Sequence, residues 1–242
     1  MRHKKPKSSN TTVINTTRIA CVGIAFCLLL CVTANADDDK TLRVFIFAGQ
    51  SNMVGSDSKV KDIKRFPPFV GLENAQTGVK FSYSIGRQNK MTSNGWVDLQ
   101  PVNNVVGPEL SFARKVSQNI DAPIAIIKCA AGGTHLGGDW NPDDPIGFKM
   151  YPLALELIRS SLAELDRQEI AYRIEGFMWH QGENDMFNPE YMANYGANLE
   201  KFLAKWRRDL NSPELKFYIG ELCTKTRSEE HTSELQSRRN LV

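Results

Sequence analysis

Short apolar segments alternate with longer amphipathic ones along this chain, and this order constrains its fold more than any other feature. The apolar runs 42–48, 122–130, 174–179 and 215–222 lack the polar alternation of half-exposed strands, as is typical of strands buried on both faces. Parallel strands need crossovers, which place helices on both faces of the sheet. The sequence therefore predicts a three-layer α/β/α sandwich with a parallel sheet.

Three segments between these runs have helical signals. Gly107 and Pro108 mark one helix start, with an acid at Glu109 where the helix dipole favours it. A second helix buries one face, formed by Ala154, Ile158, Leu162 and Leu165. The third follows Asn188-Pro189, with apolar residues three or four apart: Met192, Tyr195, Leu199, Phe202, Trp206 and Leu210. Residues 56–106 differ, and we expect an irregular insertion bordering the site, with one strand at 79–85.

The first 36 residues have the pattern of a secretory signal peptide. Five basic residues precede or begin an uncharged stretch at 19–32, which leads to Ala34-Asn35-Ala36. The apolar run is too short for a membrane span, which needs about 20 residues. We expect cleavage after Ala36, a secreted or periplasmic protein, and no stable membrane insertion afterwards. Lipidation at Cys31 is the alternative, which the bulky Leu30 disfavours.

Removal of this segment changes the charge and the cysteine content. It leaves 25 basic against 27 acidic residues, a net charge of −2, instead of the +3 of the whole chain. A near-neutral chain without a Lys/Arg block does not favour nucleic-acid binding. Only Cys129 and Cys223 remain, too few for a disulfide framework, and one bridge or two buried thiols are both open.

The C-terminal segment has an unusual sequence. From Arg227 it reads RSEEHTSELQS, which resembles the in-frame translation of a common sequencing adapter. We expect residues 37–226 to be one incomplete native domain and 227–242 a non-native tail, with a coding sequence that naturally continues past Thr226. An independent nucleotide read across codon 226 tests this expectation, and a read that reproduces RSEEHTSELQS contradicts it.

Small and polar residues follow three of the predicted strands. Ser51 comes shortly after the first, Gly132-Gly133-Thr134 after the second, and Gln181-Gly182-Glu183 after the third. Reacting groups of open α/β sheets lie at the carboxyl edge of the strands. The three motifs are therefore expected to meet at one site.

These motifs resemble a known family. GQSNM at 49–53, Gly107, AAGGT at 130–134 and WHQGEND at 179–185 are similar to the SGNH-hydrolase superfamily, in its sialate O-acetylesterase-like and plant-type acetylxylan-esterase-like branch. The resemblance covers residues 42–222. It implies a flavodoxin-like SGNH fold and hydrolysis of acetyl esters on a glycan of the sialic acid or xylan type.

The resemblance also implies roles for individual residues. Ser51 would be the nucleophile, and the oxyanion donors would be the backbone N–H groups of Ser51 and Gly107 and the Gln181 side-chain amide. Met53 replaces the second glycine of G-x-S-x-G, which disfavours an α/β-hydrolase elbow. The alternative for Ser51 is a helix N-cap. Further residues expected to line the site are Gln50, Asn52, Gly133, Thr134, His180 and Glu183.

One family element is missing. The catalytic base and its orienting acid come from an Asp-x-x-His near the family's C-terminus, and this sequence has none. His135 and His180 match no such position and are interpreted as structural or pocket-lining. Glu183 and Asp185 orient their loop, contact substrate, or simply cap the turn before Asn188. We therefore expect this chain to be nearly inactive.

Two other functions remain open beside a truncated carbohydrate O-acetylesterase. The chain could be a non-catalytic glycan-binding relative, or a lipid esterase or thioesterase on the same scaffold. No cofactor is implied, and no metal, because no His/Cys/Asp cluster has ligand spacing.

Overall fold

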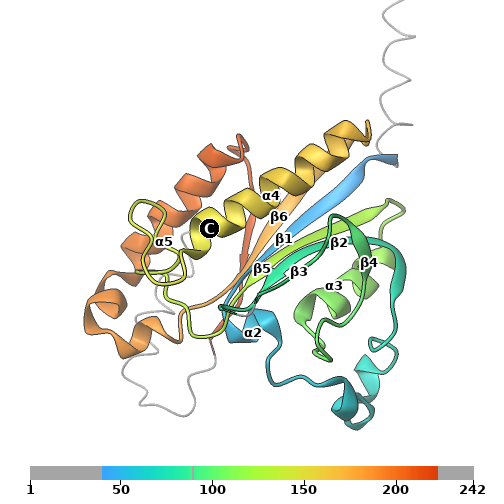
Figure 1. Cartoon of the computed structure of the whole chain (residues 1–242), viewed down its shortest axis with the longest axis horizontal. Coiled ribbons are helices and arrows are strands. Elements are labelled where there is room, and N and C mark those ends of the chain that lie inside the picture. The colour runs from blue at the N-terminus through green and yellow to red at the C-terminus, as the bar shows by residue number, and fades with distance from the viewer. Residues whose placement is uncertain (1–39, 89, 223–242) are drawn as a thin grey trace, which may run out of the picture. The chain divides into compact units, whose positions relative to one another are not determined.

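A computed structural model describes residues 40–88 and 90–222, which form a mixed sheet covered by helices on both faces (Figure 1). The strands are β1 (Leu42–Gly49), β2 (Gln76–Ile85), β3 (Met91–Thr92), β4 (Val97–Leu99), β5 (Ile124–Ala130), β6 (Tyr172–His180) and β7 (Phe217–Ile219). The helices are α2 (Ser51–Val54), α3 (Pro108–Ser117), α4 (Met150–Arg167) and α5 (Pro189–Asp209), with short 3-10 turns at Val60–Arg65, Pro67–Phe69 and Asp185–Phe187. The predicted α/β sandwich is confirmed.

The sheet order is β3-β2-β5-β1-β6-β7, with β4 also paired to β2. The pairs β2–β5, β5–β1, β1–β6 and β6–β7 are parallel. From β1, the chain passes to β2 and β5 on one side and then to β6 and β7 on the other. The carboxyl ends of β1, β5 and β6 therefore lie at the point where the strand order reverses, which is where open sheets bind ligands.

The strand expected at 79–85 is present within β2, but the interpretation of residues 56–106 as an irregular insertion was wrong in part. β2 is a full strand of the central sheet, parallel to β5 from Val79 to Ile85. β3 and β4 pair with β2 in the antiparallel direction, so the sheet is mixed and not purely parallel. These strands have only two and three residues. β3 and β4 are strands mainly because they pair with β2, and so short a sequence carries little signal for a strand.

Each face of the sheet has its own apolar core. Helices α4 and α5 cover one face, where Trp140, Trp179 and Trp206 are fully buried around Phe202. Helix α3 covers the other, with Leu110 and Ala113 against Phe47 and Phe81. Asn188 caps α5 as expected, since its side chain accepts hydrogen bonds from the N–H groups of Glu190 and Tyr191.

Two other expectations can be compared with the described residues. Cys129 is a buried free thiol whose pKa burial raises to about 12, and Cys223 lies outside the described residues. Within residues 40–88 and 90–222, none of the helices is both long and apolar enough to cross a bilayer. The expected signal peptide and the adapter-like tail both lie outside these ranges.

Candidate active site

The serine at the carboxyl end of the central strand lies at the first position of α2. Ser51 follows Gly49 and Gln50, and it is partly exposed. Its backbone N–H belongs to the first helical turn, where helix geometry provides no intrahelical acceptor. Ser51 Cβ lies 3.4 Å from the position that a Cβ on Gly132 would occupy. The structure therefore brings the first two predicted motifs into contact.

Gly49 allows the chain to turn sharply into this serine. Its φ is +152°, and a Cβ there would lie 2.1 Å from the carbonyl oxygen of His180 on the neighbouring strand. That carbonyl also accepts a 3.1 Å hydrogen bond from the N–H of Gln50. Any larger residue at position 49 would push β1 away from β6 and displace Ser51.

The residues flanking Ser51 are held by a carboxylate from the third motif. Gln50 Nε2 donates to one Glu183 oxygen over 2.5 Å, and Asn52 Nδ2 donates to the other. Asn184 Nδ2 donates to Gln50 Oε1 in turn. Gln50 is buried, whereas Glu183 is half-buried and Asn52 exposed. Glu183 therefore fixes the start of α2 from both sides of the serine.

We expect Glu183→Gln to lower kcat for p-nitrophenyl acetate by about ten- to a hundredfold with little change in Tm. A glutamine would turn an N–H group toward the Gln50 or Asn52 amide, and small displacements of reacting groups have effects of this size. Glu164→Gln is the control, because Glu164 also accepts from two side chains, Arg167 and Gln168, in exposed contacts at the C-terminal end of α4. An unchanged kcat, or equal effects of both variants, would contradict a positioning role for Glu183.

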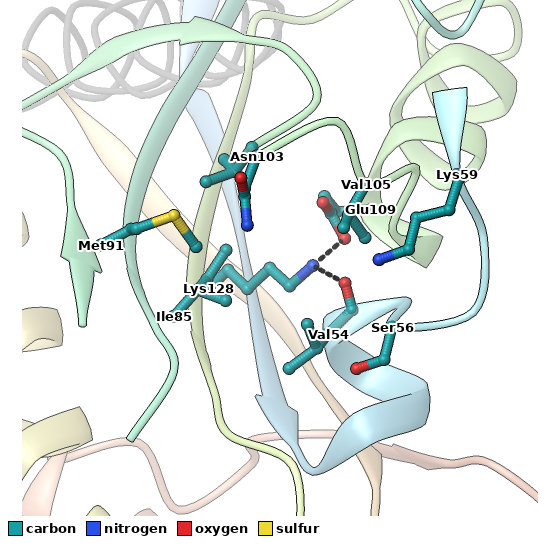
Figure 2. Close-up of a pocket in the computed structure, with 10 residues that line it drawn as sticks. Val54, Ser56, Lys59, Ile85, Met91, Asn103, Val105, Glu109 and Lys128 are labelled. Atoms are coloured by element: carbon teal, nitrogen blue, oxygen red, sulfur yellow. Dashed lines mark hydrogen bonds and ion pairs between the residues drawn. The ribbon is translucent and has the colours of Figure 1, made fainter. Parts of the chain in front are cut away.

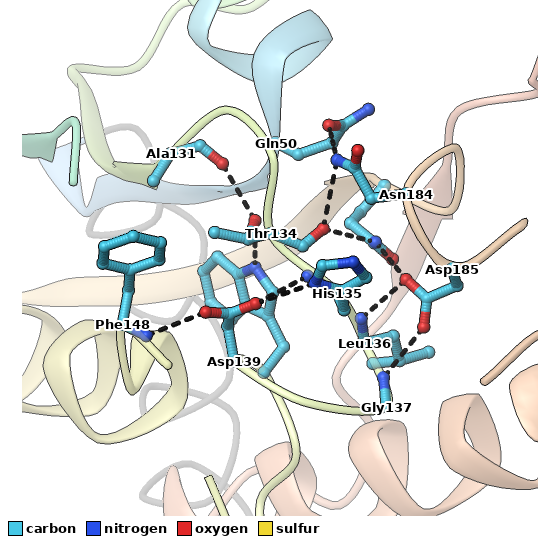
Figure 3. Close-up of polar contacts among 12 residues, drawn as sticks. Gln50, Ala131, Thr134, His135, Leu136, Gly137, Asp139, Phe148, Asn184 and Asp185 are labelled. Carbon is cyan, nitrogen blue, oxygen red and sulfur yellow. Dashed lines mark hydrogen bonds and ion pairs between the residues drawn. The ribbon is translucent and has the colours of Figure 1, made fainter. Parts of the chain in front are cut away.

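Thr134 lies at the centre of the polar contacts in Figure 3, and the buried Gln181 is hydrogen-bonded to it. Gln181 Nε2 donates to the Thr134 carbonyl over 2.9 Å and to Asp185 Oδ2 over 2.6 Å. Both hydrogens of this amide are thus donated to protein acceptors, and the side chain is 1% exposed. Thr134 Oγ1 donates to the Ala131 carbonyl and accepts from Trp140 Nε1. In this arrangement Gln181 ties the β5 loop to the β6 loop.

Asp185 orients the loop after β5. Its carboxylate accepts from the N–H groups of Leu136 and Gly137 at 2.8 and 2.9 Å, besides the Gln181 amide (Figure 3). Burial raises the pKa of this carboxyl, and the donors of Gly137, Gln181 and Leu136 oppose the shift. Of the roles left open for Asp185, the contacts favour loop orientation.

Neither described histidine is hydrogen-bonded to Ser51. His135 Nδ1 lies 3.2 Å from Asp139 Oδ2, and the ring packs edge-on against Tyr191. Asp139 also accepts from the N–H groups of His135 and Phe148, which folds the loop between them. The His180 ring packs against Gly220, where a Cβ would lie 2.8 Å from Cγ. The contacts of both residues agree with structural or pocket-lining roles.

Lys128 and Glu109 form a buried ion pair (Figure 2), and Gly107 lies beside it. Lys128 Nζ donates to Glu109 Oε2 over 2.5 Å and to the Val54 carbonyl at the end of α2 over 3.3 Å. A Cβ on Gly107 would lie 2.3 to 2.5 Å from these charged groups. Burial lowers the pKa of Lys128, and the charge of Glu109 opposes this. The pair links α2 to the turn that begins α3, and a cavity of about 170 Å³ adjoins it.

Sequence reasoning did not identify two features at this edge of the sheet. The Lys128–Glu109 pair was missed because a strand lysine and a helix acid predict no contact by themselves. Arg87 was missed because β2 was read as part of an insertion. It follows the carboxyl end of β2 by two residues, the same signal that identified Ser51.

Known proteins resemble this chain in sequence and in fold. The probable carbohydrate esterase At4g34215 of Arabidopsis thaliana is 26% identical over 185 residues, which are 72% of this chain. The chain spans 66% of that relative's length. The crystal structure of NanS matches with a TM-score of 0.63 at 17% identity, covering 84% of this chain and 75% of NanS.

Two further structures share the fold. The X-ray structure of the Arabidopsis thaliana protein AT4G34215 matches with a TM-score of 0.58 at 22% identity, covering 80% of this chain and 79% of that one. XAC1771, a carbohydrate acetylesterase from Xanthomonas citri, matches with a TM-score of 0.53 at 17% identity, over 81% of this chain and 47% of its own. At these identities the structural matches establish the α/β sandwich alone.

The family match identifies the class. Residues 41–241 match the family described as "Carbohydrate esterase, sialic acid-specific acetylesterase". This range covers most of the chain, which therefore belongs to the carbohydrate acetylesterases and, among them, to this sialic acid-specific acetylesterase family. The resemblance inferred from the motifs is confirmed. The matched range runs past Thr226, and the adapter-like origin of that segment stays a prediction.

Proposed function

We propose that this protein is a carbohydrate O-acetylesterase in which Ser51 attacks the carbonyl carbon of an acetyl ester on a glycan. The observation that carries the proposal is the position of Ser51. It lies at the carboxyl end of the central strand, in contact with Gly132 and between two side chains held by Glu183. A glycan substrate also agrees with the family to which the chain belongs.

The tetrahedral intermediate needs hydrogen-bond donors for its oxyanion, each worth about 3–4 kcal/mol. We assign this role first to the backbone N–H groups of Ser51 and Gly107, as the motifs suggested. The Lys128–Glu109 pair would fix their separation, because it contacts both the end of α2 and Gly107. The Gln181 amide can act as the third donor only if its hydrogen bond to the Thr134 carbonyl or to Asp185 breaks.

A serine hydroxyl is a weak nucleophile until a base accepts its proton. We propose that this base and its orienting acid, an Asp-x-x-His, belong to natural sequence outside the described residues, and that the chain with its present sequence has a low rate. The pairing of His135 with Asp139 resembles a base with its acid, yet Ser51 is bonded to neither. We also propose that the protein acts outside the cytoplasm.

A panel of p-nitrophenyl esters tests this function. A carbohydrate acetylesterase should hydrolyse the acetyl ester in preference to long-chain esters and should release acetate from acetylated sialic acid or xylan. Preference for long chains would favour the lipid esterase or thioesterase. Glycan binding without hydrolysis, in a chain completed by its natural sequence, would favour the glycan-binding relative. The Ser51 hydroxyl, which has no hydrogen-bond partner among residues 40–88 and 90–222, also supports that alternative.

A further inference from the structure

Arg87 lies at the same edge of the sheet as the proposed nucleophile. It follows β2, and the sheet order places β5 alone between β2 and β1. Neighbouring strands lie about 4.8 Å apart, so the ends of β2 and β1 are about 10 Å apart. A monosaccharide bearing one acetyl group spans such a distance. Arg87 can therefore contact the sugar whose ester Ser51 attacks.

The guanidinium of Arg87 is held in place by an aromatic ring and by a glycine loop. Its Cζ lies 5.2 Å from the centroid of the half-buried Phe148 ring. Its NH1 lies 3.1 Å from the position of a Cβ on Gly133, whose φ of +74° favours glycine. Gly132, the residue before Gly133, contacts Ser51. Stacking of this kind orders an arginine and leaves its N–H edge free.

Arg87 also differs from the other described arginines in its partners. Each of the others has a carboxylate or carbonyl acceptor within the protein: Arg43, Arg65, Arg114, Arg159, Arg167, Arg173, Arg207 and Arg208. Among residues 40–88 and 90–222, no such acceptor contacts Arg87, whose side chain is exposed. An ordered guanidinium without an acceptor is suited to a planar anion, which it binds through two parallel hydrogen bonds.

We propose that Arg87 forms a carboxylate-binding subsite, so that the substrate is an acetylated acidic sugar and not a neutral one such as xylose. The inference rests on the proposed function, because it uses the position of Ser51. Sialic acids and uronic acids share the required carboxylate. The family description favours a sialic acid.

Ligand titrations followed by NMR test this subsite without requiring catalysis. The ligands are N-acetylneuraminic acid, its methyl ester and D-glucuronic acid, and the proteins are the full chain, Arg87→Gln and Arg65→Gln. Arg65 is the matched control, since it is exposed and lies 5.9 Å from the ring centroid of Phe66. We expect Arg87→Gln to weaken binding of the acid at least about tenfold, as loss of a charged hydrogen bond does. Arg87→Gln should bind the methyl ester as tightly as the wild type does. Arg65→Gln should bind every ligand as tightly as the wild type does.

The outcomes separate the subsite from the proposed function. Equal affinity of the wild type for acid and methyl ester, equal losses for both ligands in Arg87→Gln, or no binding of either acid would overturn the proposal. Tighter binding of N-acetylneuraminic acid or of glucuronic acid identifies the source of the carboxylate. Hydrolysis of p-nitrophenyl acetate, which has no carboxylate, tests the proposed function separately and should be equal in Arg65→Gln and wild type. If a chain that carries its natural Asp-x-x-His fails to hydrolyse this ester, the proposed function fails, whatever the titrations show.

Discussion

Ser51→Ala should reduce hydrolysis of p-nitrophenyl acetate by at least about a thousandfold, to the background rate, because no acyl-enzyme can form without the hydroxyl. The fold should be unaffected. Ser51 is partly exposed, and no hydrogen bond within the described residues depends on its side chain. The measurement is kcat/KM, together with the thermal unfolding midpoint, in a chain that carries its natural Asp-x-x-His.

Ser56→Ala is the matched control for this variant. Ser56 follows α2 by two residues, and its N–H donates to the Ser51 carbonyl. Its side chain lines the cavity beside Lys128 and lies away from the proposed reaction. This variant should keep most of the activity. Retention of more than a few per cent of the rate in Ser51→Ala would remove Ser51 from the mechanism.

Lys128→Met should lower the free energy of unfolding by about 3–5 kcal/mol, since it leaves the Glu109 carboxylate buried without its partner. Both side chains are almost fully buried, at 1% and 2% exposure. The Val54 carbonyl at the end of α2 would lose a donor as well. Urea unfolding monitored by circular dichroism measures the change.

The double variant Lys128→Met, Glu109→Leu is the control. Replacing both members of a buried pair with apolar residues is often neutral, so the double variant should recover most of the lost stability. If it is no more stable than the single variant, or if the single variant costs less than about 1 kcal/mol, the pair does not stabilise the fold as described. A stable double variant with reduced kcat would indicate that the pair also positions Gly107.

The sequence predicted the main elements because each is encoded locally. Helix α5 has a capping asparagine and apolar residues at helical spacing, and β5 is buried along its length and apolar except for Lys128. β2 was harder to place. Its first residues are partly exposed, and only pairing with β5 makes it part of the sheet. Non-local pairing of this kind leaves no pattern within a short segment.

The location of the candidate site could be predicted from the sequence, but its hydrogen bonds and ion pairs could not. Strand ends brought Ser51, Gly132 and Glu183 together as expected, since parallel strands share a carboxyl edge. The specific contacts join residues far apart in the chain, such as Gln50 with Glu183 or Lys128 with Glu109. The geometry of these contacts depends on packing. Only the structure therefore shows that Asp185 orients the loop after β5 and that the Gln181 amide donates to Asp185.

The most direct test of Ser51 as the nucleophile is the location of the acetyl group during the reaction. The protein is incubated with p-nitrophenyl acetate, quenched in acid, digested and analysed by tandem mass spectrometry. A weak or missing base slows deacylation as well as acylation, so an acetyl-enzyme can persist long enough to detect. The proposed mechanism predicts an acetyl group on Ser51 in the wild type and none at this position in Ser51→Ala. Acetate release with no acetyl group on Ser51 would contradict the mechanism. So would an acetyl group on another residue that also forms, at the same rate, in Ser51→Ala.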